Sequence, residues 1–180
     1  MTGGEVGRRY AKALAEIAER RGSLDETGAE LEAAAEGLTR HVELRRVLDN
    51  PRFPAPTRMR LVESVLSAAG ASDLIRNFVR LIVKKDRMAE LEGIAMQYRE
   101  IADEKRNRVR AQVRTAFELS GGQLERLRAR LSEMTGSEVL IEVERDESLI
   151  GGIICRVGSV MMDGSIRNQI KNLREKMVAG

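Results

Sequence analysis

The sequence predicts a mainly α-helical protein, in which an N-terminal six-helix bundle is followed by a small α+β domain. Aromatic residues make up only 3% of the chain and Trp is absent, so aliphatic side chains must fill the core, which suits helices packed on helices. All three prolines lie in one loop, residues 51–56, and leave the helical stretches unbroken. The hydrophobic period switches from helical to alternating near residue 106, which predicts domains at 1–106 and 107–180.

Residues 5–105 carry apolar side chains at three- and four-residue spacing, the pattern of consecutive amphipathic helices. The first helix is predicted to end at Gly22. Ser23, followed three residues later by Glu26, has the capping-box pattern and predicts the start of a second helix. A short third helix then leads into the proline loop.

Three further helices are predicted beyond that loop. Gly70 is expected to end the fourth, and Ser72 or Asp73 to cap the fifth. The sixth is expected to run from about Met88 to Lys105. Six amphipathic helices joined by short loops are typical of a bundle.

The second domain is predicted to run strand, helix, strand, hairpin, helix. Apolar and polar residues alternate from Val109 to Phe117, as in a strand with one solvated face. Ser120 and Gln123 form another capping-box pattern, which opens the next helix. The stretch "SEVLIEVERD" predicts a second strand, and the mixture of elements is α+β.

The glycine-rich stretch from Asp146 to Leu173, "DESLIGGIICRVGSVMMDGSIRNQIKNL", raises the question of a phosphate-binding loop. Such a loop needs the spacing G-x-x-x-x-G-K-[ST], with a lysine that reaches the phosphates. Here Gly158 and Gly164 enclose five residues, and Ser165 follows without a lysine. The spacing and the missing cation argue against phosphate binding.

The same stretch has a structural interpretation that accounts for more of its residues. Gly151 and Gly152 are expected to form a bend at the entry to a strand. Gly158 and Ser159 suit a two-residue hairpin turn of type II′. Asp163 is expected to cap the last helix with its carboxylate.

The charge pattern gives little support to nucleic-acid binding, although the pI is about 9.3. Charged residues make up 33% of the chain, but the net charge is only +3 and the two signs are interleaved. Residues 1–106 hold 19 basic and 18 acidic residues, and the rest holds 12 and 10. A basic nucleic-acid-binding helical adaptor is therefore the alternative function and not the first one.

No set of residues suggests catalysis, a metal site or a cofactor site. Cys155 is predicted to lie within a strand with no histidine nearby, as a buried structural thiol does. His41, the only histidine, has no partner at metal-ligand spacing. The N-terminus lacks the apolar region of a signal peptide, and no stretch approaches the ~20 apolar residues of a membrane span. We therefore expect a non-enzymatic interaction protein.

Four segments carry a resemblance to a known family: "RRYAKAL", "NFVRLIVKKDRM", "DESLIGGI" and "VGSVMMDGSIRNQIKNL". Together they resemble the delta subunit of F-type ATP synthases, whose mitochondrial counterpart is the oligomycin-sensitivity-conferring protein. This chain has Ser159 where the family usually has an acidic residue, and Asp86 where it often has glycine. The matching signature residues, expected to be structural, are Gly151, Gly152, Gly158, Asp163, Gly164 and Ser165.

The resemblance implies a non-catalytic stator subunit that links the catalytic head to the peripheral stalk and resists rotor torque during ATP synthesis. The implied partners are the alpha and neighbouring beta subunits of the head and the b subunits of the stalk. Neither nucleic acid nor direct lipid contact is expected. The implied location is peripheral, on the cytoplasmic face of a bacterial plasma membrane.

The resemblance also implies a site on the first domain. The N-terminal helix of an alpha subunit would bind in a groove between the first and fifth helices, while the second domain would receive the b subunits. Matched onto this sequence, the groove would be lined by Tyr10, Ala13, Leu14 and Ile17 of helix one and by Phe78, Leu81 and Ile82 of helix five.

Overall fold

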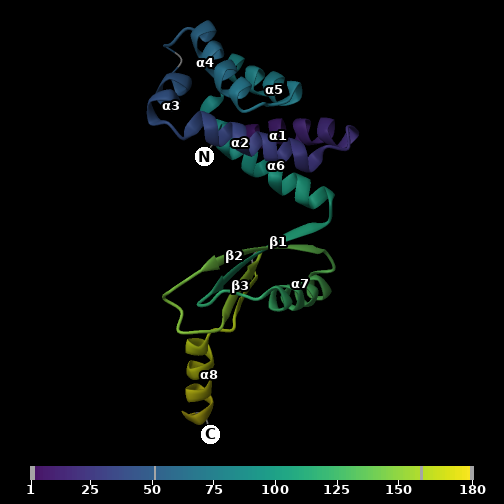
Figure 1. Cartoon of the computed structure of the whole chain (residues 1–180), viewed down its shortest axis with the longest axis vertical. Coiled ribbons are helices and arrows are strands. Elements are labelled where there is room, and N and C mark those ends of the chain that lie inside the picture. The colour runs from purple at the N-terminus through teal and green to yellow at the C-terminus, as the bar shows by residue number, and fades with distance from the viewer. Residues whose placement is uncertain (1–2, 51, 159, 179–180) are drawn as a thin grey trace. The chain divides into compact units, whose positions relative to one another are not determined.

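The computed structural model describes residues 3–50, 52–158 and 160–178 (Figure 1). Contacts within the chain divide it into two compact units, which we call the N-terminal unit (residues 1–103) and the C-terminal unit (residues 104–180). The described residues are mainly helical, with one small sheet, which confirms the predicted general layout.

The described part of the N-terminal unit is built from helices joined by short connections. The helices are α1 (Gly3–Arg20), α2 (Leu24–Thr39), α3 (Val42–Asp49), α4 (Ala55–Ala68), α5 (Asp73–Lys84), the 3₁₀ turn η1 (Met88–Glu90) and α6 (Leu91–Lys105). The predicted proline loop needs one correction, because α4 begins inside it: Pro54 stands at the N-cap position of α4 and Pro56 in its first turn, while Pro51 lies outside the described residues.

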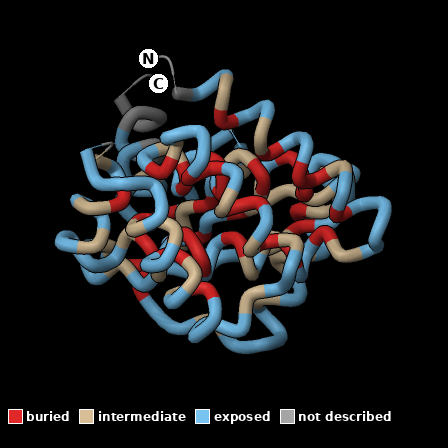
Figure 2. The backbone as a smooth tube through the Cα atoms, turned by 90° about the horizontal axis from the view of Figure 1, so that it is seen from above, coloured by how far each residue is buried: buried red, intermediate tan, exposed pale blue. Residues whose placement is uncertain are grey.

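Each of these helices buries one face in a shared core, and buried positions recur along the chain at helical intervals (Figure 2). The fully buried side chains are almost all aliphatic, as the scarcity of aromatic residues requires. The largest of them include Leu14, Leu31, Leu38, Leu48, Leu66, Ile75, Ile82, Leu91 and Ile94.

Tyr98 of α6 is the largest fully buried side chain among the described residues, with 1% of its surface exposed. Its hydroxyl donates a 2.9 Å hydrogen bond to the carbonyl of Leu24 at the start of α2. Its ring lies 3.1 Å from where a Cβ would project at Gly28, so only a glycine fits there without a shift. Tyr98 therefore fixes the position of α2 against α6.

Burial raises the pKa of Tyr98 to about 12, which gives a prediction for the pH dependence of stability. Because the folded-state pKa lies above the ordinary value near 10, the stabilisation is complete below pH 10 and falls as the pH rises to 12. Its full size is about 2–3 kcal/mol. Thermal unfolding measured by circular dichroism from pH 9 to 12 should show this loss, and Tyr98→Phe should show a smaller one. Equal slopes in the two proteins would contradict the assignment.

The helix starts confirm one predicted cap of this unit and correct another. The hydroxyl of Ser72 accepts a hydrogen bond from the Ile75 amide at the start of α5, as predicted. Ser23 occupies the predicted N-cap position of α2, but its side chain makes no capping bond. Its hydroxyl lies instead 3.3 Å from that of Thr27 and 3.5 Å from the Ala18 carbonyl. The prediction of a capping box at Ser23 was therefore wrong.

The loop after α5 contains a residue in the left-handed region, Asp86, with φ of 54°. This conformation suits glycine, which the family resemblance led us to expect at this position. Here the Asp86 carboxylate accepts a 2.6 Å hydrogen bond from Arg58 of α4, whose side chain is 5% exposed. Arg58 also donates through Nε to the Phe53 carbonyl. The aspartate thus ties together the end of α5, the start of α4 and the proline loop.

The C-terminal unit contains a four-stranded sheet in the order β2-β1-β3-β4. β1 pairs in parallel with β2 over eight residues and antiparallel with β3, which in turn pairs antiparallel with β4. The chain order strand, helix, strand, hairpin, helix was predicted correctly. The elements are β1 (Arg108–Thr115), α7 (Gly121–Thr135), β2 (Glu138–Arg145), β3 (Ile153–Val157), β4 (Val160–Asp163) and α8 (Ile166–Val178).

Helix α7 connects the two parallel strands and packs on one face of the sheet (Figure 1). The predicted capping box opens it, since Ser120 accepts from the Gln123 amide and Gln123 accepts from the Ser120 amide. One correction concerns the end of β1. The strand stops at Thr115, so Phe117 lies beyond it and is 69% exposed. The second core consists of Ala111, Val113, Leu131, Val139 and Cys155.

Candidate partner-binding sites

Helix α1 has two apolar stripes, and only one of them belongs to the core. Ala11, Leu14, Ala15 and Ala18 are buried. Roughly a third of a turn away, Tyr10 is half-buried, Ala13 is exposed, and Ile17 is 41% exposed. The second stripe is what a surface for a partner helix requires, because a helix that meets only solvent would carry polar residues there.

Helix α5 also carries an apolar residue outside its buried face. Ile75, Val79, Ile82 and Val83 are completely buried, and Phe78 is 8% exposed. Leu81 points away from them and is 41% exposed. We call the exposed and half-exposed apolar residues of the two helices, Tyr10, Ala13, Ile17 and Leu81, the α1/α5 face.

The predicted lining residues therefore separate into two groups. Leu14 and Ile82, at 1% and 0% exposure, are core residues, and Phe78 is nearly so. These three side chains cannot contact a partner unless the core opens. The prediction that they line the groove is therefore wrong for the structure as it stands. The error arose because the 3.6-residue period identifies apolar positions on a helix but does not tell its core-facing stripe from a second exposed one.

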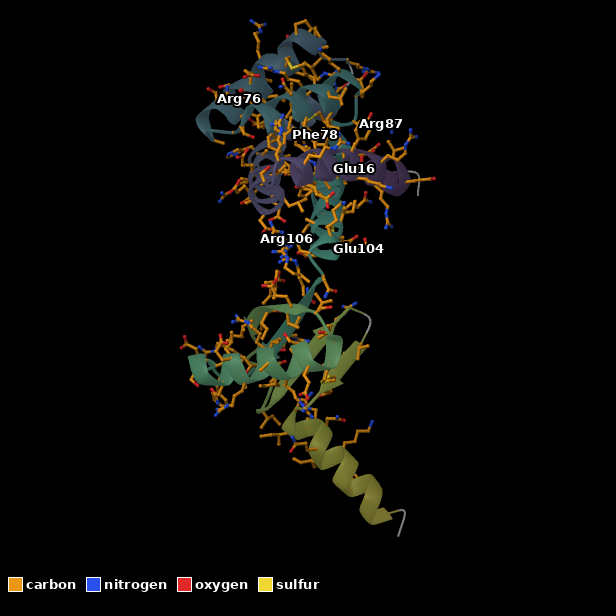
Figure 3. All side chains as sticks on the ribbon, turned by 90° about the vertical axis from the view of Figure 1, so that its right-hand side faces the viewer. Glu16, Arg76, Phe78, Arg87, Glu104 and Arg106 are labelled. Atoms are coloured by element: carbon orange, nitrogen blue, oxygen red, sulfur yellow. The ribbon has the colours of Figure 1, made fainter. Side chains whose placement is uncertain are left out.

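Helices α1 and α5 are neighbours. The hydrogen bond and charge of Glu90 raise the pKa of Arg87, just beyond α5, and the Tyr10 side chain of α1 contributes to the same shift. Figure 3 shows Phe78 on α5 above Glu16 on α1, and Figure 1, a quarter turn away, also draws the two helices side by side. The four residues of the α1/α5 face thus belong to adjacent helices.

Two further concave surfaces were not anticipated from the sequence. A groove of about 420 Å³ lies between α2 and α6, with Ala35 and Ala95 as its floor and Met96 exposed at its rim. A pocket of similar volume lies where β1 and β2 end, lined in part by Phe117 and Val143. The second could have been suspected from "AFELSGG", where an aromatic residue stands next to helix-start signals.

The signature residues of the C-terminal unit surround a close approach of two backbone segments. Gly152 has φ of +85°, and a Cβ there would lie 2.4 Å from the carbonyl oxygen of Gly164 and 2.8 Å from the Cα of Ser165. A Cβ at Gly151 would lie 2.6 Å from the Ile166 side chain. The predicted bend at the strand entry is confirmed, and the contact with residues 164–166 explains why it consists of glycines.

Hydrogen bonds hold the two segments together and correct the predicted cap of α8. Gly164 donates to the Ile153 carbonyl at 2.9 Å, and Ile166 donates to the Gly151 carbonyl at 3.0 Å. The Ser165 hydroxyl accepts from the Asn168 amide and so occupies the capping position.

Asp163, which was predicted to cap this helix, instead accepts a 2.9 Å bond from the Ser165 amide. Hydrogen bonds from the Ser165 hydroxyl and from this amide lower the pKa of the Asp163 carboxyl. The Asp163 carboxylate therefore stabilises the turn that precedes α8, and Ser165, two residues later, is the residue that caps the helix. The prediction failed because Asp and Ser are both good caps and lie two residues apart.

The predicted hairpin is present, since Val157 pairs with Val160 across it. Gly158 has φ of +58°, as the first position of a type II′ turn requires. Ser159 lies outside the described residues. Gly158 thus has a structural role.

The described residues hold no cluster of three or more His, Cys, Asp or Glu side chains that could bind a metal ion. Cys155 is buried in the second core, and burial raises the pKa of its thiol, which disfavours the reactive thiolate. His41 stands at the N-cap position of α3 without a capping bond. In the part of the chain that the structure describes, no helix is long and apolar enough to span a bilayer.

Comparison with known proteins shows which family the chain belongs to. Residues 6–177 match the family model described as the ATP synthase delta (OSCP) subunit. The chain belongs to this family. Its members are non-catalytic subunits of the ATP synthase peripheral stalk, in agreement with the resemblance drawn from the sequence.

Relatives of the delta subunit family match over nearly their whole length. ATP synthase subunit delta of Desulfatibacillum aliphaticivorans is 38% identical, with 96% of this chain and 94% of the relative covered. The subunit of Myxococcus xanthus is 37% identical, and the alignment covers 96% of this chain and 96% of the relative. The subunit of Syntrophobacter fumaroxidans is 34% identical, and the alignment covers 97% of this chain and 96% of the relative.

The fold of the delta subunit family is also found among solved structures. A chain of the Toxoplasma gondii mitochondrial ATP synthase hexamer aligns with a TM-score of 0.65 at 17% identity, over 97% of this chain and 98% of that one. At this identity the match shows a shared fold. It covers both units.

Proposed function

We propose that this delta subunit joins the catalytic head of a bacterial ATP synthase to the b subunits of the peripheral stalk and holds the head against rotor torque. In this proposal the N-terminal unit is a six-helix bundle that binds the N-terminal helix of an alpha subunit, close to a neighbouring beta subunit. The C-terminal unit receives the b subunits, and the protein stays peripheral, on the cytoplasmic face of the plasma membrane.

The observation that carries the proposal is the α1/α5 face. Ile17 and Leu81 leave 41% of their surfaces exposed on neighbouring helices, and the exposed Ala13 on α1 leaves room for a close helix approach. An amphipathic helix that covers these side chains would be held in the helix-in-groove mode. Among the described residues, no cluster of three or more His, Cys, Asp or Glu side chains offers a competing metal site.

A binding experiment tests the site. We expect a synthetic peptide from the N-terminus of the alpha subunit to bind the full chain in isothermal titration calorimetry. Leu81→Asp should weaken binding at least about a hundredfold, because the variant would bury an unpaired carboxylate against an apolar helix. Helicity measured by circular dichroism should not change, because Leu81 lies outside the core.

The matched control is Met96→Asp, which places the same charge on α6 at a residue that is 67% exposed and lines the other groove. It should bind the peptide like the unmodified chain. Loss of binding in Met96→Asp but not in Leu81→Asp would move the site to the α2/α6 groove. Co-purification of a chain tagged at either end should separately recover alpha and b subunits.

A further inference from the structure

Two pairs of exposed basic residues border the α1/α5 face. Ile17 is followed at the third and fourth positions by Arg20 and Arg21, in "IAERR". Leu81 is followed at the same positions by Lys84 and Lys85, in "LIVKK". Residues three and four apart lie next to each other on a helix surface, so each exposed apolar side chain has two cations beside it.

These four cations are available to a partner. All four are exposed, and none forms an ion pair or side-chain hydrogen bond with another residue that the structure describes. Other basic residues of α5 differ in this respect. Arg76 and Arg80 both pair with Glu63 of α4. The nearby Asp86 carboxylate is already bound by Arg58 and does not neutralise the lysines.

The two basic pairs lie at opposite ends of the face. Tyr10 of α1 is close to Arg87 beyond the end of α5, whereas Glu16, later in α1, lies further back along α5, between Arg87 and Phe78 (Figure 3). The helices therefore run in opposite directions. Arg20 and Arg21 end the face at the C-terminus of α1, and Lys84 and Lys85 end it at the C-terminus of α5.

We propose that the α1/α5 face recognises an acidic amphipathic helix, with an apolar stripe for Ile17 and Leu81 and carboxylates about two helical turns apart for the two basic pairs. This inference rests on the proposed function and adds the chemistry of the partner segment to it. The apolar stripe between the basic pairs favours such a helix over a nucleic acid, which would need a continuous basic track.

A purely structural role for the basic pairs predicts something different. Each pair ends a helix, where cations stabilise the exposed carbonyls of the last turn. Neutralising the pairs would then lower the temperature of unfolding and leave binding alone. The proposal requires the reverse.

The test uses calorimetry with the full chain and two peptides. The first is the N-terminal segment of the alpha subunit, which should contain the predicted carboxylates. The second is the same peptide with Asp and Glu changed to Asn and Gln. The protein variants are the double substitutions Arg20→Gln with Arg21→Gln, and Lys84→Gln with Lys85→Gln. The control is Arg8→Gln with Lys12→Gln, which removes two exposed cations from another side of α1.

Each double variant at the face should bind the acidic peptide about three- to tenfold more weakly in 50 mM salt, as expected for two exposed ion pairs. The control should bind like the unmodified chain. Raising the salt to 0.5 M should weaken binding of the unmodified chain and reduce the difference between it and the variants. The neutralised peptide should bind all proteins alike, and unfolding temperatures should not change.

The proposal fails if the peptide binds, Leu81→Asp abolishes binding, and neither salt nor the basic variants have any effect. In that case the helix site stands and its electrostatic recognition does not. If the peptide does not bind at all, the proposed function fails as well. Displacement of the peptide by a single-stranded oligonucleotide at equal concentration would overturn the proposal in favour of nucleic-acid binding.

Discussion

We expect Gly152→Ala to destabilise the C-terminal unit by at least about 3 kcal/mol. A left-handed φ costs an alanine about 1–2 kcal/mol, and overpacking adds a similar amount or more. The overpacking is unavoidable here because the new Cβ would lie 2.4 Å from a backbone carbonyl oxygen, that of Gly164, and not from a side chain that could turn aside. Amide hydrogen exchange on β1 and β3 in the full chain measures this loss directly.

Substitutions at two other glycines separate the cost of the left-handed backbone from the cost of overpacking. Gly136→Ala has the same backbone problem, with φ of +66°, but open space around the Cβ, and should cost only about 1 kcal/mol. Gly122→Ala, in the first turn of α7 with nothing within 4 Å, should be neutral or stabilising. If Gly152→Ala behaved like Gly136→Ala, the close approach of the two segments would have no energetic importance.

The second large effect is expected at Asp86. Asp86→Asn should destabilise the N-terminal unit by about 1–3 kcal/mol, because it leaves the nearly buried guanidinium of Arg58 without a counter-charge. Asparagine tolerates the left-handed conformation, so the backbone adds no penalty. Urea unfolding followed by circular dichroism, together with hydrogen exchange of α4 and α5, would measure the loss.

The matching control removes the charge on both sides. The double variant Asp86→Gly with Arg58→Met has no buried unpaired cation and gives the loop its preferred glycine, so it should recover most of the lost stability. A double variant no more stable than Asp86→Asn would show that Arg58 stabilises the unit mainly through its bond to the Phe53 carbonyl.

Where a structural feature depends on neighbours in the chain, the sequence predicted it well. The capping box of Ser120 and Gln123 is one case, since every partner it needs lies within three residues. Ser23 has the same pattern, yet its hydroxyl turns to Thr27 and to the end of α1, because two helices meet there at a sharp turn. The same local signal can thus be overridden by a second local partner.

Features that depend on distant parts of the chain could not be predicted in this way. Nothing near Leu14 or Ile82 indicates that these side chains face the core while Ile17 and Leu81 do not. Likewise, a bend of the chain at Gly152 was predicted from the sequence. The contact that requires a glycine there, however, is with Gly164, twelve residues further along the chain. Such contacts arise from tertiary packing, and the spacing of hydrophobic residues along the chain does not predict them.

The position of β1 has a mechanical consequence. This strand follows directly after α6 and occupies the middle of the sheet, with β2 on one side and β3 on the other. A pull transmitted through the chain from the N-terminal unit therefore reaches the sheet of the C-terminal unit first at β1. Displacing β1 from the sheet therefore requires breaking its bonds on both sides, over eight residue pairs with β2 and five with β3. An edge strand, which pairs on one side only, would have about half as many bonds to hold it.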